Sequence, residues 1–245
     1  MAEKIQFHIG TSGWYYDHWK EVFYPQGLPK TKWFEYYRNY FSTVEINATF
    51  YRRFKEKTYE KWYRQADAPF IYVLKVPRII THRKYLQDVD EQVREFCESA
   101  ALLHEKLGML LLQLAPSTTY DLQILEEALD AFSDPQKVVV EVRHKRWLTA
   151  EFKELLTRHK IAFCNMDSPR LSVSDWITSG KAYYRFHGRA GMYTYDYSEN
   201  ELKEIAEQLY GLSKQGVKEV YVFFNNDYEG NAVKNALALK KLLNI

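Results

Sequence analysis

The stretch STVEINATFY, residues 42–51, alternates apolar and polar side chains. Val44 and Ile46 are apolar, whereas Glu45 and Asn47 are polar. On a half-exposed strand the polar set would face water, but in a sheet covered on both faces it has no water-facing side. The number and direction of the other strands therefore decide where these polar side chains point.

Seven further segments have the composition of strands, and helical patterns separate most of them. These segments are residues 5–10, 70–76, 109–114, 138–143, 161–165, 182–188 and 220–225. The clearest helical pattern covers residues 89–107, where apolar residues recur at a spacing of about 3.6. Only the segment 168–180, SPRLSVSDWITSG, lacks a good helical pattern.

Strands that alternate with helices indicate a parallel sheet with crossover helices. Eight such repeats in 245 residues predict an α/β fold, a (β/α)8 TIM-barrel-like domain with a weak or missing helix after the sixth strand. A doubly wound open sheet is the alternative, although it usually has fewer strands at this length. No linker-like composition divides the chain, so we expect a single domain over residues 1–245.

In such a barrel, alternate residues of each strand point to the interior. Val44 and Ile46 are expected to meet helices, which sends Glu45 and Asn47 inward. The same alternation assigns an inward polar residue to the other strands: His8, Lys75, Gln113, Glu141, Arg143, Asn165, Arg185, His187 and Asn225. Most of them lie toward the C-terminal strand ends, where barrel active sites form.

Composition excludes several classes of function. The 34 basic and 32 acidic residues nearly balance, so no overall charge directs the molecule to nucleic acid or to an anionic membrane. Two cysteines provide neither a disulfide framework nor a zinc quartet. The first residues lack the apolar core of a signal peptide, and no apolar run is long enough to span a membrane, which predicts a cytoplasmic protein.

A set of motifs at the strand ends is distinctive when taken together. The motifs are IGTSGWYYDHWKEVFYP, VEINATFYR, LKVPRIITH, LLLQLAPS, VVEVRHKRW, YYRFHGR and VYVFFNNDYEGNAVKNA. In this order they resemble the YecE/YunF-type family, a bacterial group of unknown function, over essentially the whole chain. The resemblance implies a TIM-barrel-like fold and supplies no reaction. Ala115 stands where the family usually has the first of two prolines, and Arg146 precedes Trp147 where a small residue is expected.

Anion binding is the first candidate chemistry. Loops after the last strands of a barrel often bind phosphate together with a helix N-terminus. The inward charges include one more cation than anion, and an anionic ligand would balance it. The predicted substrate- or anion-binding residues are Ser12, Trp14, Asn47, Arg78, His82, Gln113, Arg143, Asn165, Arg185, Arg189, Asn225 and Asn226. The alternative is that Gly188 and Gly191 only make turns and that Asn226 or Asp227 caps a helix.

The candidate catalytic residues are Glu45, Glu141, Lys75 and His187. The two glutamates would act as general acid and base if burial raised the pKa of one of them. Nearby cations would instead hold both ionised, which favours a structural or ligand-orienting role. For Lys75 a salt bridge is favoured over a Schiff base, because nearby carboxylates oppose a lowered pKa.

Metal and serine chemistry have less support. The chain has no HExxH motif, no paired-histidine spacing and no GxSxG motif, so we predict no cofactor and keep a divalent metal as an alternative. The aromatic residues after the first strand, Trp14 among them, could stack on a ring or pack as a lid.

The sequence therefore predicts an enzyme, a hydrolase or isomerase, that acts on a small phosphorylated or otherwise anionic molecule. Two alternatives remain open: a nucleic-acid-binding or metal-dependent phosphodiesterase-like barrel, and a non-catalytic metabolite-binding protein. A closed ion-pair network that only stabilises the barrel mouth would fit the same residues.

Overall fold

The computed structural model describes residues 5–67, 69–173 and 175–245. Eight strands form one sheet in the order β1-β8-β7-β6-β5-β4-β3-β2. The pairs β1–β8, β7–β8, β3–β4, β4–β5 and β5–β6 are all parallel. This order, with helices between most consecutive strands, is that of the predicted α/β, (β/α)8 TIM-barrel-like fold.

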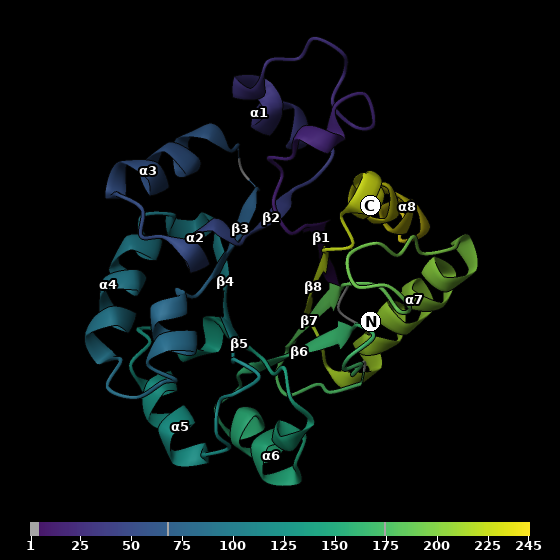
Figure 1. The fold of residues 1–245 in the computed structure, drawn as a ribbon. Helices are drawn as coiled ribbons and strands as arrows, with labels where there is room; N and C mark the ends of the chain where they lie inside the picture. Colours follow the sequence, from purple (N-terminus) through teal and green to yellow (C-terminus); the bar gives the residue numbers. More distant parts are fainter. Residues whose placement is uncertain (1–4, 68, 174) are drawn as a thin grey trace. The chain divides into compact units, whose positions relative to one another are not determined.

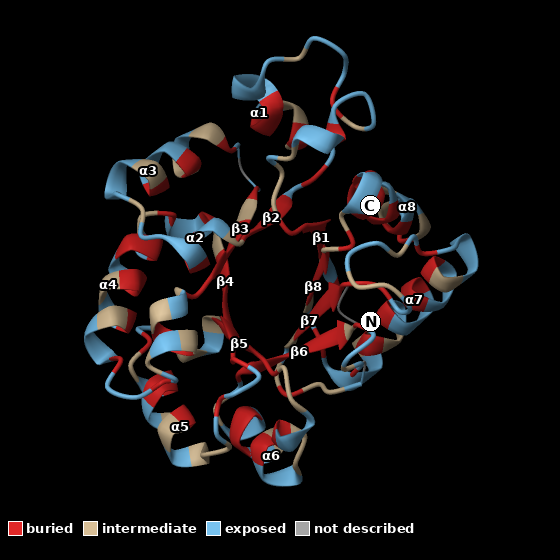
Figure 2. Ribbon diagram, viewed as in Figure 1, coloured by how far each residue is buried: buried red, intermediate tan, exposed pale blue. Residues whose placement is uncertain are grey.

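The predicted strand boundaries lie within two residues of the observed ones. The strands are β1 (Gln6–Thr11), β2 (Thr43–Ile46), β3 (Ile71–Lys75), β4 (Leu107–Gln113), β5 (Val138–Glu141), β6 (Ala162–Asp167), β7 (Lys181–Phe186) and β8 (Glu219–Phe224). Every strand is buried along almost its whole length, as Figure 2 shows in red. Burial on both faces explains why these strands are nearly continuously apolar.

In the part of the chain that the structure describes, helices follow every strand except β6. The α-helices are α1 (Trp33–Tyr37), α2 (Ala48–Tyr51), α3 (Glu56–Gln65), α4 (Asp90–Ala101), α5 (Leu122–Asp130), α6 (Ala150–Arg158), α7 (Glu199–Gly211) and α8 (Asn231–Leu242). Short turns of 3-10 or π-helix are η1 (Asp17–Trp19), η2 (Lys30–Lys32), η3 (Ile79–Arg83), η4 (His104–Lys106), η5 (Pro135–Lys137), η6 (Lys145–Trp147), η7 (Leu212–Gln215) and η8 (Tyr228–Gly230).

The missing helix after β6 was predicted. The described residues between β6 and β7 contain no helix. Val173 instead pairs with Met166 in an antiparallel bridge, with two backbone hydrogen bonds of 2.7 and 2.8 Å. No helix in the described part of the chain combines the length and the apolar character that crossing a membrane requires.

The chain divides into two compact units. The first unit comprises Met1–Glu45, Asn165–Asp175 and Gly180–Ile245, and the second comprises Ile46–Cys164 and Trp176–Ser179. β2 and β6 each contribute residues to both units.

In the first unit, α7 and α8 lie side by side, and α8 packs against β1 and β8 (Figure 1). A capping box starts α7: the Ser198 hydroxyl accepts from the Glu201 N–H, and the Glu201 carboxylate accepts from the Ser198 N–H. The segment between β1 and β2 buries an aromatic cluster in which the rings of Tyr24 and Trp33 stack 4.6 Å apart. These contacts hold the loop that follows β1 against α1.

In the second unit, α2 to α6 accompany β3, β4 and β5 (Figure 1). Side-chain caps start α5 and α6: Asp121 accepts from two backbone N–H groups, and Thr149 accepts from one. The last residues of β3, β4 and β5 are Lys75, Gln113 and Glu141. Parallel strands thus bring three polar side chains to one edge of this ladder.

Candidate functional site

Glu45 is the centre of a buried hydrogen-bond network in the first unit. It follows Val44 in β2, and no part of its side chain is exposed. Ser12 donates to its Oε1 over 2.7 Å, and Tyr183 donates to its Oε2 over 2.7 Å. Arg185 from β7 donates to both carboxylate oxygens, with Nη2–Oε1 and Nε–Oε2 distances of 2.7 and 2.9 Å. Such a two-point guanidinium–carboxylate pair fixes the orientation of both groups.

This network sets the charge of Glu45. Burial alone would raise the pKa of its carboxyl, but the charge and hydrogen bonds of Arg185 and the bonds from Tyr183 and Ser12 together lower it. Glu45 is therefore ionised at neutral pH, which argues against a role as a general acid. The prediction that it is catalytic thus gains no support from its electrostatics, and orienting Arg185 is the role that the geometry favours.

His187 lies beside this network. Its Nε2 is 3.5 Å from Arg185 Nη1, and its Nδ1 is 3.1 Å from the Asn225 amide nitrogen. Which ring nitrogen of His187 carries the proton decides the direction of each of these hydrogen bonds. The ring is completely buried. These contacts are those of a hydrogen-bonded interior histidine.

Other predicted binding residues of the first unit already have protein partners. Arg189 forms ion pairs of 3.0 Å with Asp167 and with Glu201, which argues against its prediction as an anion ligand. The amide nitrogen of Asn226 donates to Tyr195 O and to Asn235 Oδ1, both over 2.7 Å.

Two further predicted residues are also packed inside the first unit. Asn165 in β6 is completely buried. The Trp14 ring packs against Phe34 at 5.1 Å, as expected for a lid residue.

The second unit holds the other predicted carboxylate. Glu141 is completely buried, accepts from Gln113 Nε2 over 2.6 Å and forms an ion pair with Arg143. The thiol of Cys164 lies 3.8 Å from its Oε2. The β4–β5 register explains the first contact, because Gln113 pairs directly with Glu141 across the ladder.

Lys75 and His82 meet at the ring of Phe50. Lys75 Nζ lies 4.2 Å from the centre of this ring, and the His82 ring contacts it edge-on at 4.9 Å. His82 is half-buried, and its Nδ1 is 2.8 Å from the Thr81 hydroxyl. Burial and the charges of three cations lower the pKa of His82 to about 4; the cations are Lys75, Arg78 and Arg143. The imidazole is therefore neutral at physiological pH and surrounded by positive charge.

Asn47 does not belong to a strand. It was predicted as the inward end of the strand over residues 43–47, but it lies at the N-cap position of α2 with helical backbone angles. β2 ends one residue earlier, at Ile46. The prediction that it lies on the strand is therefore wrong, because the chain turns into a helix at this point.

A cavity of about 180 Å³ lies next to Phe50 in the second unit, and we call it the arginine pocket. Its lining is Thr49, Phe50, Tyr51, Arg52, Arg53, Tyr59, Pro77, Arg78, Ile79, Arg83, Gln92, Glu95, Phe96 and Ser99. Among the described residues, only Arg53 of its four arginines has a carboxylate partner, Glu95 at 2.8 Å.

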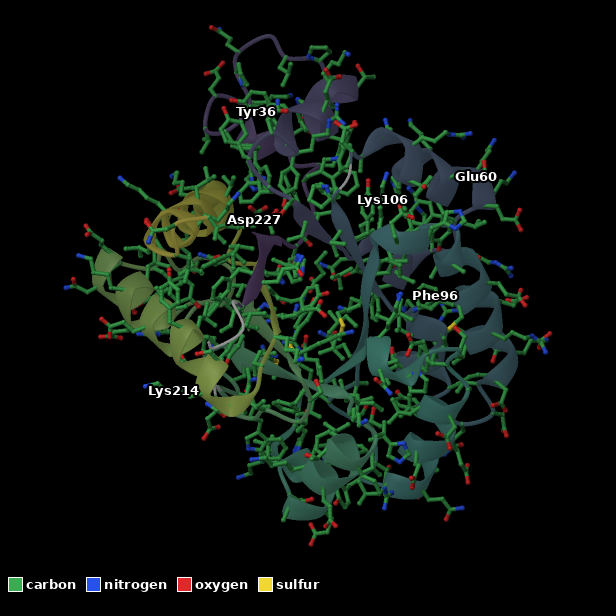
Figure 3. All side chains as sticks on the ribbon, turned by 180° about the vertical axis from the view of Figure 1, so that it is seen from behind. Tyr36, Glu60, Phe96, Lys106, Lys214 and Asp227 are labelled. Carbon is green, nitrogen blue, oxygen red and sulfur yellow. The ribbon has the colours of Figure 1, made fainter. Side chains whose placement is uncertain are left out.

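The arginine pocket also contains an unsatisfied hydrogen-bond acceptor. Gln92 Oε1 is buried and has no hydrogen-bond partner in the described part of the structure. A buried acceptor without a donor is costly, so a donor from a ligand or water is expected there. Phe96, labelled in Figure 3, lines the same pocket from α4.

The comparisons with known proteins agree with this fold. A family model described as "Protein of unknown function DUF72" matches residues 8–245. The chain belongs to the DUF72 family. The UPF0759 protein YunF of Bacillus subtilis (strain 168) is 26% identical over 273 residues, which covers 97% of this chain and 95% of YunF. The expected YecE/YunF-type membership is thereby confirmed.

Two solved structures of DUF72 family proteins match almost the whole chain. The protein from Thermotoga maritima MSB8 is 33% identical, with a TM-score of 0.88 over 98% of this chain and 100% of that one. The protein from Enterococcus faecalis V583 is 22% identical, with a TM-score of 0.83 over 98% of this chain and 96% of that one. These likenesses extend the same fold to other DUF72 proteins from bacteria.

Several residues of interest were not predicted as site residues. Arg52 lies at the C-terminal end of α2, and Gln92 lies in α4. Both are outside the strand ends, where the site residues were predicted from the sequence. His18 and Asp227, which contact each other, are 209 positions apart and share no spacing pattern. Among the described residues, no group of three or more His, Cys, Asp or Glu side chains is arranged to hold a metal ion.

Proposed function

We propose that this DUF72 protein is an enzyme, a hydrolase or isomerase, that binds a small phosphorylated or otherwise anionic substrate in its second unit. The observation that carries the proposal is the arginine pocket. Arg52, Arg78 and Arg83 line it, and none of them has a carboxylate partner among the described residues. Three unpaired guanidiniums around one cavity create a positive potential that an anion would neutralise.

Lys75 and Arg143 extend the positive charge beyond the pocket. Both lie close enough to His82 to lower its pKa, as Arg78 does. The ring of Phe50 lines the pocket and also contacts Lys75 and His82. An anion bound by Arg78 would therefore lie near the polar ends of β3 and β5, where the acid–base candidates of this unit are found.

The proposed acid–base groups are His82 and Glu141. The neutral imidazole of His82 can accept a proton, and a bound anion would raise its pKa toward physiological pH. Glu141 is held by Gln113 and Arg143, so it can orient the guanidinium or exchange a proton with the substrate. We keep the cytoplasm as the proposed location, since neither cysteine forms a disulfide.

The test is sulfate binding measured by isothermal titration calorimetry at constant ionic strength. Sulfate keeps its charge over the pH range used, so its own protonation does not confuse the result. We expect the wild type to bind sulfate and Arg78→Gln to lose about 10-fold or more in affinity, because a hydrogen bond to a charged group contributes roughly 1.5–3 kcal/mol. Arg64→Gln is the matched control, since Arg64 is an exposed arginine of α3 outside the pocket.

The pH dependence checks the role of His82. Its pKa is about 4 in the free protein and should rise when an anion binds nearby. Binding is then coupled to proton uptake, so sulfate affinity should increase as the pH falls from 7 to about 5, and His82→Gln should remove this increase. No sulfate binding by the wild type, or equal binding by Arg78→Gln, would contradict the proposal.

Consumption of a bound ligand distinguishes an enzyme from a protein that only binds it. Phosphorylated sugars and nucleotides that compete with sulfate should be consumed when incubated with the protein, and the product can be followed by ³¹P NMR. Ligands recovered unchanged would favour the metabolite-binding alternative. A short oligonucleotide that competes with sulfate and weakens steeply with added salt would favour nucleic-acid binding.

A further inference from the structure

A histidine–carboxylate pair lies in the first unit. His18 belongs to η1 after β1, and Asp227 follows β8. His18 Nε2 lies 2.8 Å from Asp227 Oδ2 and 2.8 Å from the Asp227 backbone oxygen. Trp19 Nε1 donates to Asp227 Oδ1 over 2.6 Å. Figure 3 shows Asp227 near the start of α8.

These contacts determine which nitrogen of His18 carries the proton. Nε2 faces two oxygen acceptors, so the hydrogen of a neutral imidazole belongs on Nε2. Nδ1 then keeps its lone pair. None of the residues that the structure describes hydrogen-bonds to this Nδ1, and 45% of the His18 side chain is exposed. An exposed, unprotonated ring nitrogen backed by a carboxylate is the arrangement of a general base.

Asp227 is held firmly in this pair. Its side chain is 16% exposed, and both carboxylate oxygens have a donor, Trp19 on one and His18 on the other. Burial raises the pKa of Asp227 to about 6, although the bonds from Trp19 and His18 act to lower it. The carboxylate holds the His18 ring in one orientation through its contact with Nε2.

The pair opens into a hollow of about 600 Å³. Tyr193, Thr194, Tyr228 and Glu229 contribute to its lining. Tyr193 and Glu229 have positive φ values of 68° and 54°, which non-glycine residues rarely adopt. A backbone hydrogen bond of 2.9 Å from Tyr228 N to Tyr193 O joins the two strained segments. Backbone strain held by its surroundings occurs preferentially at functional sites.

The lining indicates the chemistry of the ligand. It contains the carboxylates of Asp227 and Glu229 and no lysine or arginine, so an anion would be repelled. Tyr193 and Tyr228 are 44% and 58% exposed, which makes their rings available for stacking. Aromatic faces together with carboxylate and hydroxyl acceptors suit an uncharged ring that carries hydroxyl groups, as a sugar does.

We propose that His18 and Asp227 form a general-base dyad that removes a proton from a hydroxyl group of an uncharged sugar ring. The simplest reaction that needs this step is ring opening. The anomeric O–H bond breaks and its proton moves to His18 Nδ1. As the oxygen electron pair forms the C=O bond, the ring C–O bond breaks and its electron pair stays on the ring oxygen, which takes up a proton from water. The hydroxide left behind takes the proton from His18 Nδ1, which restores the neutral imidazole. His18 is the catalytic base, and Asp227 is a positioning residue that acts through it.

The first measurement is the ring tautomer, read from long-range ¹H–¹⁵N NMR spectra of the full chain. We expect the proton on Nε2 of His18 in the wild type. Asp227→Asn should shift the tautomer population toward Nδ1, because the new amide can donate to Nε2, although the backbone oxygen of residue 227 can still accept from it. His18→Gln identifies the His18 signals by their loss, and His104→Gln, which removes an exposed histidine of η4, is the control in which they stay. A wild-type His18 protonated on Nδ1 would overturn the general-base assignment.

The second measurement is the mutarotation rate of a panel of uncharged aldoses, followed by polarimetry. We expect the wild type and His104→Gln to accelerate at least one sugar, and His18→Gln to lose about 100-fold or more of this acceleration. Asp227→Asn should lower kcat far more than it changes KM, which a merely structural role would not do. Circular dichroism verifies that each variant is folded.

No acceleration of any aldose would overturn the ligand class even if the tautomer is as expected. Acceleration that survives His18→Gln would overturn the dyad. The inference does not rest on the arginine pocket, because all its residues belong to the first unit. Sulfate binding and mutarotation can therefore fail independently of each other.

Discussion

Arg185 and Arg189 stand four positions apart in the sequence but have very different surroundings. Arg185 is 1% exposed and is bound at two points to a Glu45 carboxylate that is completely buried. Arg189 is 41% exposed and pairs with Asp167 and Glu201 near the surface. Removing one partner of a buried pair leaves a buried charge uncompensated, whereas an exposed pair contributes little. The two arginines therefore form a matched pair for a stability test.

We expect Arg185→Met to lower the free energy of unfolding by about 3–5 kcal/mol, because it leaves the Glu45 carboxylate without its guanidinium. Arg189→Met should cost no more than about 1 kcal/mol. Urea denaturation followed by circular dichroism at pH 7 measures both. Similar losses for the two variants would mean that the Glu45–Arg185 pair is not the main stabilising contact of this network.

The sequence predicted which polar side chains are buried more readily than it predicted which side chains they contact. Alternation along the strands predicted that Glu45, Glu141 and Arg185 are inside, and all three are buried. It did not find the contact between His18 and Asp227. Pairing of side chains from distant loops depends on how the backbone folds between them, and a spacing rule within one strand carries no such information.

The hydrophobic periodicity predicted where the strands lie but not the residues at which they end. Arg143 was assigned to a strand over residues 138–143, but β5 ends at Glu141 and Arg143 lies in the loop that follows. The π-helical turn η3, which carries His82, has no sequence signature that distinguishes it from a loop. Such local turns decide which side chains converge, so the site was harder to predict than the sheet.

Gly10 in β1 shows why one small residue is required inside a strand. A Cβ atom at this position would lie 2.5 Å from the backbone oxygen of Thr43, the first residue of β2. Backbone atoms cannot move aside as a flexible side chain can, so Gly10→Ala should destabilise the protein by about 1–3 kcal/mol. Thermal unfolding monitored by circular dichroism measures the change.

Gly211 at the end of α7 is the control. A Cβ there would meet no atom within 4 Å, and its backbone is not in the left-handed region. Gly211→Ala should therefore stabilise the protein by about 0.5–1 kcal/mol, because alanine loses less conformational freedom on folding than glycine. If both substitutions changed stability equally, close packing of β1 on β2 would not explain Gly10.

The eight strands and their order follow from the sequence because each strand–helix repeat has a local hydrophobic pattern. The division into two compact units was not expected. Composition reveals a domain boundary only when a linker separates the domains, and here the chain passes from one unit to the other within β2 and within β6. Whether the chain behaves as a single domain therefore depends on whether the two units unfold together.

Because β2 and β6 each belong to both units, neither unit can lose its strands without disrupting the other, and we expect one cooperative unfolding transition. Differential scanning calorimetry should give a calorimetric enthalpy equal to the van't Hoff enthalpy, of roughly 170 kcal/mol for a chain of this size. Arg185→Met in the first unit and Leu112→Ala in the second, where Leu112 is completely buried, should each shift the same single peak to lower temperature. A thermogram that splits into two peaks, of which each substitution moves only one, would mean that the units unfold independently and that the chain folds as two domains.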